Sequence, residues 1–176
     1  MISRATDLRV EVLAGSLVLS RTDCTTRAAV VKHLAAAIAR HATVVEGPSV
    51  RMPMDVDDLV VPDLVAVVAA PSGGGPVRTQ DIELAVEVVP RQEKGREFGH
   101  KADWYAVACV RALLVVDPRY GTWALHTEPD RARYRKLRSG CFGDTVPTPY
   151  VVETAALPVY DGRGDGADEC QRRDLT

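Results

Sequence analysis

The segment LAVEVVPRQEKGREFGHKADWY, residues 84–105, decides the fold, because it joins a buried strand to a helix. Its first half is a near-continuous apolar run, which is typical of a strand covered on both faces. Glu87 stands in the middle of this run, and Lys101 follows 14 positions later, on a helix predicted over residues 97–108. A carboxylate inside an apolar strand is costly unless a positive group lies against it. The segment therefore predicts a central strand and a cationic partner for Glu87.

The rest of the chain predicts a mixed sheet flanked by helices. A second apolar run, residues 59–71, and residues 81–90 are expected to form the centre of the sheet. Strand and helix patterns around them predict an N-terminal β-hairpin (8–20), an amphipathic helix (25–41), short strands at the sheet edge (42–47 and 49–53), a further buried strand (111–118) and an antiparallel pair (122–127 and 132–138).

The bulk properties indicate an ordinary globular protein. The chain has 176 residues, 46% of them hydrophobic, so we expect a single domain over residues 1–158. The glycine-rich, charged residues 159–176 are predicted to be a disordered tail. The sequence shows no signal segment and no apolar run near the roughly 20 residues that span a bilayer, so the cytoplasm is the expected location.

Charge and cysteine content narrow the function classes. A formal net charge of -2 gives no general attraction to polyanions, so binding of nucleic acid would depend on a local patch or a bound cation. The four cysteines lie far apart and form no CxxC pair. This spacing predicts reduced thiols rather than a zinc site or a dense disulfide framework.

Asp63 is a second carboxylate of interest, since it follows Pro62 at the start of the neighbouring apolar run. Adjacent strands would bring it close to Glu87, where the two carboxylates would repel each other. A bound divalent cation, which prefers oxygen ligands, commonly relieves such repulsion. Removing either charge is then expected to leave the fold intact or to stabilise it. Two simpler interpretations stay open: Asp63 as a strand-entry residue, and Glu87 paired with one of the 18 arginines.

Lys101 supplies a third charged group. It lies about 60° to the side of the apolar stripe of its predicted helix, which consists of Phe98, Ala102, Tyr105 and Cys109. From there its side chain would reach over the sheet edge. The chain has only four lysines, which favours a specific role, although a snorkelling side chain at the helix boundary is the alternative.

In their order, these motifs resemble the bacterial "putative restriction endonuclease" family of the PD-(D/E)XK nuclease superfamily. The resemblance runs from about Glu11 to Leu157. It rests on EVLAGSLVLS (11–20) for an opening Glu-x-x-x-Gly hairpin, VPDLVAVV (61–68) for an aspartate strand, LAVEVV (84–89) for a glutamate strand and GHKADWYAVACVRALLVVDP (99–118) for a lysine helix with its following strand. Much of the superfamily has a lysine two residues after the glutamate, where this chain has Val89, and Lys101 falls where this family is understood to supply it instead.

The resemblance implies a restriction endonuclease-like α/β fold, with a mixed central sheet flanked by helices and an N-terminal β-hairpin. It implies a metal-dependent DNA endonuclease that hydrolyses phosphodiester bonds. Asp63, Glu87 and the backbone carbonyl of Val88 would hold Mg²⁺ or Mn²⁺. Lys101 would orient or deprotonate water and stabilise the pentavalent phosphorus.

Further implications concern Glu11 and the partners. Glu11 would add a contact in the catalytic site, unless it lies on the solvent face of its hairpin. DNA would be the substrate, no membrane would be involved, and a homodimer would allow one site per chain to cut both strands. The alternative is a catalytically inactive nuclease-fold binding or assembly protein. It stays open because the family's Ser-Pro-Ser segment is replaced by residues 89–93, and the histidine that often opens its first long helix is replaced by Arg27.

Overall fold

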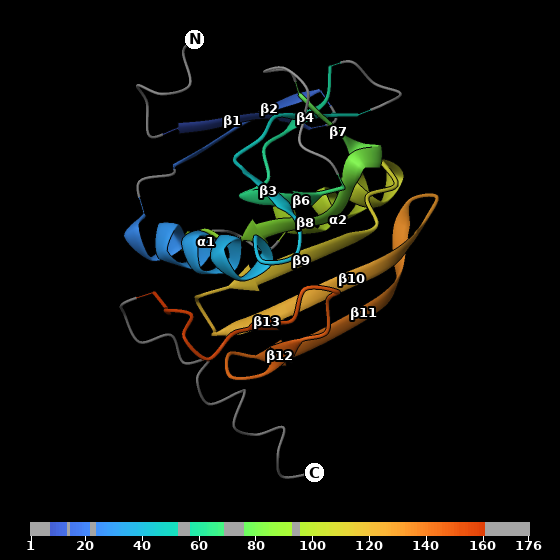
Figure 1. Cartoon of the computed structure of the whole chain (residues 1–176). Coiled ribbons are helices and arrows are strands. Elements are labelled where there is room, and N and C mark those ends of the chain that lie inside the picture. Colours follow the sequence, from blue (N-terminus) through green and yellow to red (C-terminus); the bar gives the residue numbers. More distant parts are fainter. Residues whose placement is uncertain are drawn as a thin grey trace.

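The structure, a computed structural model, describes residues 8–13, 15–21, 24–52, 57–68, 76–92 and 96–160 of the chain. These residues form an α/β fold built around a six-stranded mixed sheet (Figure 1). The sheet has the strand order β11-β10-β9-β8-β6-β3, with β8 and β9 parallel and the other neighbours antiparallel. Its members are β3 (Thr43–Glu46), β6 (Leu64–Val67), β8 (Ile82–Val88), β9 (Ala112–Asp117), β10 (Thr122–Asp130) and β11 (Arg133–Cys141).

A smaller sheet of five strands lies beside the large one, with the order β2-β1-β5-β4-β7. It contains β1 (Leu8–Leu13), β2 (Ser16–Arg21), β4 (Val50–Arg51), β5 (Leu59–Val60) and β7 (Val77–Arg78). The helical elements are α1 (Thr25–Ile38), α2 (Arg96–Val107) and a 3-10 turn (Thr79–Asp81), and a short pair, β12 (Thr145–Val146) and β13 (Val152–Glu153), follows the large sheet.

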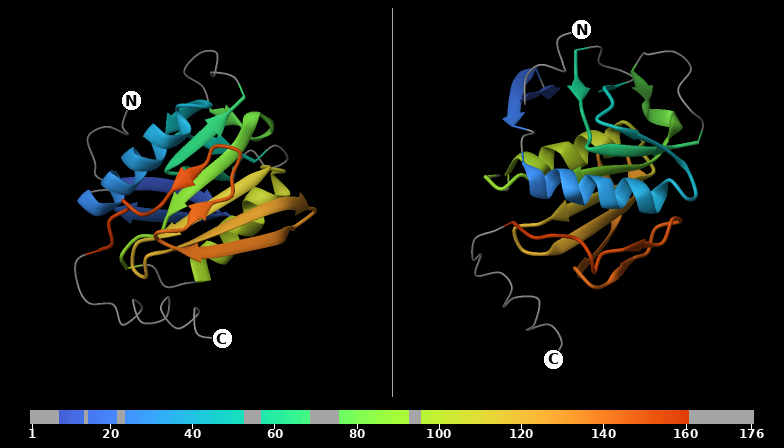
Figure 2. Two further views of the ribbon diagram at one scale, coloured as in Figure 1. Left: turned by 60° about the horizontal axis from the view of Figure 1, so that its bottom comes forward. Right: turned by 60° about the vertical axis from the view of Figure 1, so that its left-hand side comes forward.

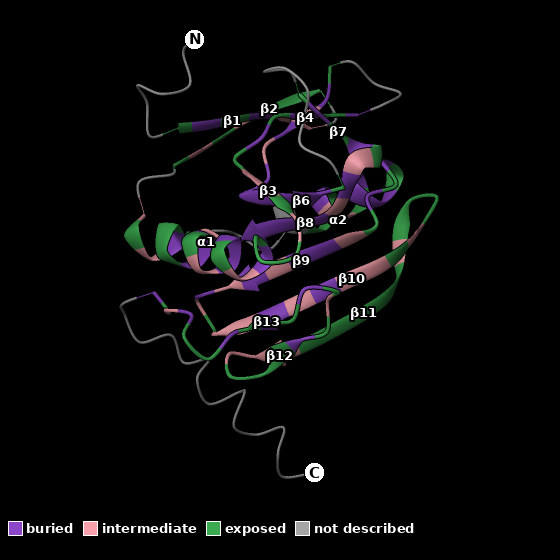
Figure 3. Cartoon of the chain, in the orientation of Figure 1, coloured by how far each residue is buried: buried purple, intermediate pink, exposed green. Residues whose placement is uncertain are grey.

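The two helices cover opposite faces of the large sheet (Figure 2). On the α1 face, Leu84, Val86 and Val88 of β8 belong to a hydrophobic core with the buried residues of α1. On the α2 face, Ala85 belongs to a second core that α2 shares with the small sheet. Glu87 follows Ala85 on this second face by strand alternation. The centre of the large sheet is thus buried on both sides, as Figure 3 shows for β8 and β9.

The structure confirms the predicted fold class, with its N-terminal hairpin, its two helices and its central strand β8. Two expectations about strands were wrong. The apolar run 59–71 divides between β5 in the small sheet and β6 in the large one, and Pro62, which has no N–H to donate, lies at the division. Strand β4, expected at a sheet edge, lies between β5 and β7, because the next strand along the chain pairs with one side of it and the more distant β7 pairs with the other.

Helix α2 ends earlier than predicted, at Val107. Cys109, expected on the buried stripe, has a positive φ of 57° and is exposed, because it lies beyond the end of the helix. Tyr105 is buried as predicted, and the buried side of this segment also includes Lys101 and Trp104. The aromatic rings of Trp104 and Tyr105 meet edge to face, with centroids 5.3 Å apart.

The C-terminal part of the fold closes against the end of β8. The Tyr160 hydroxyl donates to the Val89 carbonyl at 2.7 Å, and its backbone N–H donates to the Pro118 carbonyl at 3.0 Å. The packed chain therefore continues to residue 160, and the rest of the predicted tail, residues 161–176, lies outside the described residues.

Two of the remaining expectations concern cysteines and membranes. Cys24 and Cys109 are free thiols, whereas Cys141 is disulfide-bonded. The expectation of reduced thiols was therefore wrong for Cys141, since spacing along the sequence does not report which cysteines meet in the fold. Within the described ranges, no helix has both the length and the apolar character needed to cross a membrane.

Candidate active site

The pairing of β6 with β8 brings Asp63 and Glu87 to the same end of neighbouring strands. Asp63 immediately precedes β6, whose Leu64 lies opposite Val86 of β8. The Asp63 backbone N–H donates to the Val86 carbonyl at 3.0 Å. In return, the Val88 backbone N–H donates to Asp63 Oδ2 at 2.7 Å. The backbone of β8 therefore fixes the Asp63 side chain directly.

Glu87 lies against α2 and is only 1% exposed. Its carboxylate accepts hydrogen bonds from Lys101 Nζ at 3.1 and 3.2 Å and from the Tyr105 hydroxyl at 2.8 Å. Lys101 Nζ also lies 2.9 Å from Glu11 Oε2. The other oxygen of Glu11 accepts from the Val61 backbone N–H at 2.8 Å. Lys101 therefore bridges a carboxylate of the large sheet and one of the hairpin.

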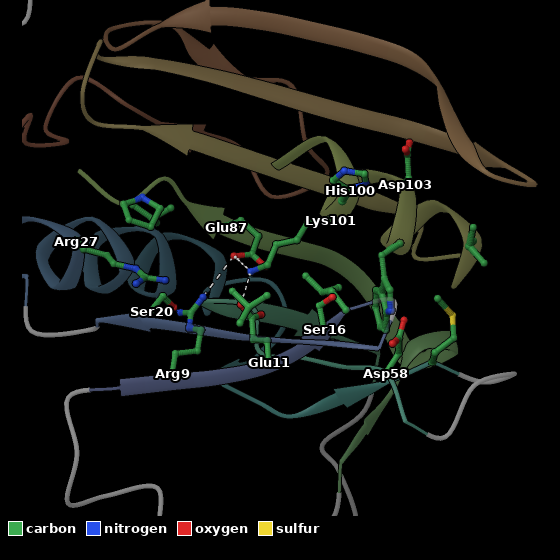
Figure 4. A pocket seen from close by; sticks show the side chains of 17 residues that line it. Arg9, Glu11, Ser16, Ser20, Arg27, Asp58, Glu87, His100, Lys101 and Asp103 are labelled. Atoms are coloured by element: carbon green, nitrogen blue, oxygen red, sulfur yellow. Dashed lines mark hydrogen bonds and ion pairs between the residues drawn. The ribbon is translucent and has the colours of Figure 1, made fainter. Parts of the chain in front are cut away.

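Two arginines complete the cluster from the Asp63 side. Arg9 lies between the acids, with Nη2 at 2.6 Å from Asp63 Oδ1 and Nη1 at 3.4 Å from Glu87 Oε2. Arg27, near the start of α1, donates from Nε to Asp63 Oδ1 at 2.9 Å. We call the six side chains the charge cluster: Arg9, Glu11, Arg27, Asp63, Glu87 and Lys101. Figure 4 labels its members that line the cavity, Arg9, Glu11, Arg27, Glu87 and Lys101. All six are buried, and their three formal negative charges match three positive ones.

Burial and mutual attraction shift the pKa values of these groups. Burial raises the pKa of Glu87 above its ordinary value, although Lys101 and Arg9 act in the opposite direction. Burial alone would lower the pKa of Lys101, but Glu87 and Glu11 outweigh it and raise the pKa. Burial and the neighbouring Glu87 charge raise the pKa of Tyr105 well above its usual value. At neutral pH, Lys101 is therefore a charged donor, and it is not poised to remove a proton from water.

The cluster opens into a cavity of about 510 Å³ between α2 and the small sheet. Arg9, Glu11, Glu87 and Lys101 line this cavity, whereas Asp63 does not. One face of the β1–β2 hairpin forms a wall, because Arg9 and Glu11 alternate with residues that point away. Arg27 lines the cavity as well, so a ligand there can meet every member of the cluster except Asp63.

The structure thus brings together all five residues proposed from the sequence, namely Glu11, Asp63, Glu87, Val88 and Lys101. Glu11 faces the cluster rather than solvent. Sequence reasoning did not assign Arg9, Arg27 or Tyr105 to the site. Arg9 could have been found, since it shares a strand face with Glu11, whereas the hydroxyl contact of Tyr105 had no sequence signal.

The oxygen atoms at Asp63 and Glu87 match a divalent metal ion in chemistry but not in arrangement. Carboxylates of Asp63 and Glu87 and the backbone carbonyl of Val88 are hard oxygen ligands of the kind that Mg²⁺ and Mn²⁺ prefer. Among the residues that the structure describes, no group of three or more His, Cys, Asp or Glu side chains is arranged to hold a metal. The Arg9 guanidinium lies between the two acids. The set fits such an ion in its chemistry, and joint binding by both acids requires Arg9 to move away.

Comparison with solved structures defines the class of fold. The chain is similar to a putative nuclease belonging to DUF820 from Anabaena variabilis ATCC 29413, with a TM-score of 0.62 and 12% sequence identity, over 80% of this chain and 81% of that one. At this identity the likeness shows a shared, nuclease-like fold. Residues 1–159 match the model of the Uma2 family, described as "Putative restriction endonuclease", and the chain belongs to this family. No curated protein matches the sequence.

Proposed function

We propose that this protein is a divalent-metal-dependent endonuclease that hydrolyses phosphodiester bonds in DNA. The observation that carries this proposal is the meeting of Asp63, Glu87 and Lys101 in one buried cluster that opens into a cavity. Family membership and the nuclease-like fold support the same reaction class.

Each part of the cluster has a role in this proposal. Asp63, Glu87 and the Val88 carbonyl would hold Mg²⁺ or Mn²⁺, which when bound supplies Lewis-acid activation of water and phosphate. Lys101, charged because its pKa is raised, orients water and stabilises negative charge on the phosphate. Glu11 positions Lys101 through their 2.9 Å contact.

A DNA-cleavage assay tests the proposal. Supercoiled plasmid should be nicked in the presence of millimolar MgCl₂ or MnCl₂ and remain intact with EDTA. Glu87→Gln and Lys101→Ala should abolish the nicking. Glu83→Gln is the matched control, because it makes the same change on the same strand outside the cavity, where Glu83 contacts Arg111 and the Tyr150 hydroxyl. Cleavage that persists in Glu87→Gln would refute the assignment of the site.

The balance of charge within the cluster favours one alternative, a nuclease-fold binding or assembly protein without activity. Three acids are already matched by three cations, and Arg9 and Arg27 both contact Asp63. Calorimetric titration with MnCl₂ separates the two functions. For an enzyme, the ion binds the wild type and binds Arg9→Ala more tightly, because a competing cation has been removed. For an inactive protein, neither binds it.

We also propose that the protein acts as a homodimer. Each chain has one site, which cuts one strand at a time, so two chains together can cut both strands of a duplex. The outer face of the β1–β2 hairpin supports this, because it exposes four large apolar side chains: Leu8, Val10, Leu17 and Leu19. Strand β2 is also an edge strand of the small sheet. Sedimentation should show a dimer for the wild type and a monomer for the double variant Leu17→Lys, Leu19→Lys. A monomeric wild type would contradict this assembly.

A further inference from the structure

The end of the cavity away from Arg27 is lined by two buried polar side chains that have unpaired atoms. Asp58 and Trp104 both line the cavity, and they are only 7% and 6% exposed. Within the described part of the chain, Asp58 Oδ1 and Trp104 Nε1 have no hydrogen-bond partner. Buried polar atoms normally have partners, so an unpaired acceptor and an unpaired donor beside one cavity indicate a place for polar atoms of a ligand.

This end of the cavity lies close to the charge cluster along both β1 and α2. Val12 of β1 pairs with Leu59, so Asp58 comes opposite Leu13, two residues or about 7 Å along β1 from Glu11. Trp104 follows Lys101 by three residues, about 4.5 Å along α2. In the view of Figure 4, Asp58 lies on the opposite side of the pocket from Arg27. We call this region the distal compartment: Leu13, Met52, Asp58, Trp104 and Val107.

The chemistry of the distal compartment restricts its ligand. The free Oδ1 of Asp58 is an acceptor, so it disfavours a phosphate oxygen and favours an N–H donor. The Trp104 indole only donates, so it disfavours a metal ion and favours an acceptor on the ligand. Apolar side chains of Leu13, Met52 and Val107 form the rest of the wall. A flat ring with an amine beside a ring acceptor satisfies all three conditions.

We propose that the distal compartment binds a single unstacked nucleobase, on the nucleotide that adjoins the phosphodiester held at the charge cluster. This inference rests on the proposed nuclease function. The exocyclic amine of the base donates to Asp58, and a ring acceptor accepts from Trp104. Carboxylates accept from the amine of cytosine in protein–DNA complexes, so bases with an exocyclic amine are preferred to thymine.

Binding of one base in a pocket requires that base to leave the stack. Single strands and frayed ends are therefore bound more tightly than intact duplex. The edge-to-face contact between Trp104 and Tyr105 fixes the indole ring. Because the Tyr105 hydroxyl donates to Glu87, the base-binding wall and the charge cluster are held by adjacent residues of one helix.

Fluorescence anisotropy with labelled oligo(dC), oligo(dA) and oligo(dT) in EDTA tests the proposal without cleavage. The wild type should bind oligo(dC) and oligo(dA) about tenfold more tightly than oligo(dT), the size of one good base contact. Asp58→Asn and Trp104→Phe should reduce the oligo(dC) and oligo(dA) affinities to that of oligo(dT). Asp81→Asn, the same change outside the cavity, should keep the preference, and thermal melting verifies the folding of each variant.

The outcomes separate this inference from the proposed function. Equal binding of the three oligonucleotides by the wild type, or a preference that survives in folded Asp58→Asn, overturns the base-binding compartment and leaves the nuclease proposal standing. Absence of binding to any oligonucleotide also overturns the compartment, and the plasmid-cleavage assay with MgCl₂ or MnCl₂ then decides the nuclease proposal by itself. If Trp104→Phe does not fold, the Asp58→Asn result alone decides whether the compartment binds a base. Among the described residues Asp58 Oδ1 has no hydrogen-bond partner, so the substitution breaks no hydrogen bond at this atom.

Discussion

The two acids of the charge cluster are held in different ways, although they lie on neighbouring strands. Asp63 accepts from Arg9 of β1, Arg27 of α1 and the Val88 backbone of β8, so its carboxylate joins three elements of the fold. It does not line the cavity. Its contacts therefore hold β1, α1 and β8 together.

Glu87 instead depends mainly on one helix. Lys101 and Tyr105 of α2 are its short-range partners, and Arg9 lies further away, at 3.4 Å. Glu87 lines the cavity together with Lys101. Asp63 therefore holds the N-terminal elements to the sheet in addition to its proposed role as a metal ligand, whereas Glu87 and Lys101 present a carboxylate and an amine to the cavity.

The largest expected effect is on stability in Asp63→Asn. The change leaves Arg9 and Arg27 buried without their main charged partner, and breaking buried ion pairs in this way costs about 3–5 kcal/mol. The sequence suggested the opposite, because repulsion between two acids was expected to dominate, but Arg9 lies between them. Urea denaturation measures the free energy of unfolding.

Asp81→Asn is the matched control for this experiment. Asp81 pairs with Arg78 at 2.8 Å, a distance like those in the cluster, but the Arg78 side chain is exposed. Such surface pairs contribute about 0–1 kcal/mol. If Asp63→Asn were no less stable than Asp81→Asn, the buried ion pairs of Asp63 would not hold the N-terminal elements to the sheet.

An intermediate effect is expected on the Glu87 side, in Tyr105→Phe. The change removes the hydroxyl that donates to the buried carboxylate and keeps the ring, so it should cost about 1.5–3 kcal/mol, as hydrogen bonds to charged groups do. Tyr134→Phe is the control, because its hydroxyl donates to the neutral Val110 carbonyl at the same 2.8 Å. Equal losses in the two variants, measured by thermal denaturation, would contradict a charged Glu87.

The contrast between the two acids also separates what the sequence could predict from what it could not. Periodicity placed Glu87 on β8 and Lys101 on α2, and Pro62 marked the position of Asp63, because these features depend on residues close in sequence. The arginines depend on which surfaces pack together. Strand alternation puts Arg9 on the same face as Glu11, but only the fold shows that this face covers the end of β8.

The smallest effect concerns the pH dependence of stability. Because burial raises the pKa of Glu87 above 4.5, the folded state binds its proton more tightly than the unfolded state does. The stability that this proton contributes is fully present below about pH 4.5 and is lost as the pH rises through the folded pKa. Glu87→Gln removes this titration, so its unfolding free energy should decline less than that of the wild type between pH 4.5 and neutrality. Parallel curves for Glu87→Gln and the wild type would show that Lys101 and Arg9 compensate fully for the burial of Glu87.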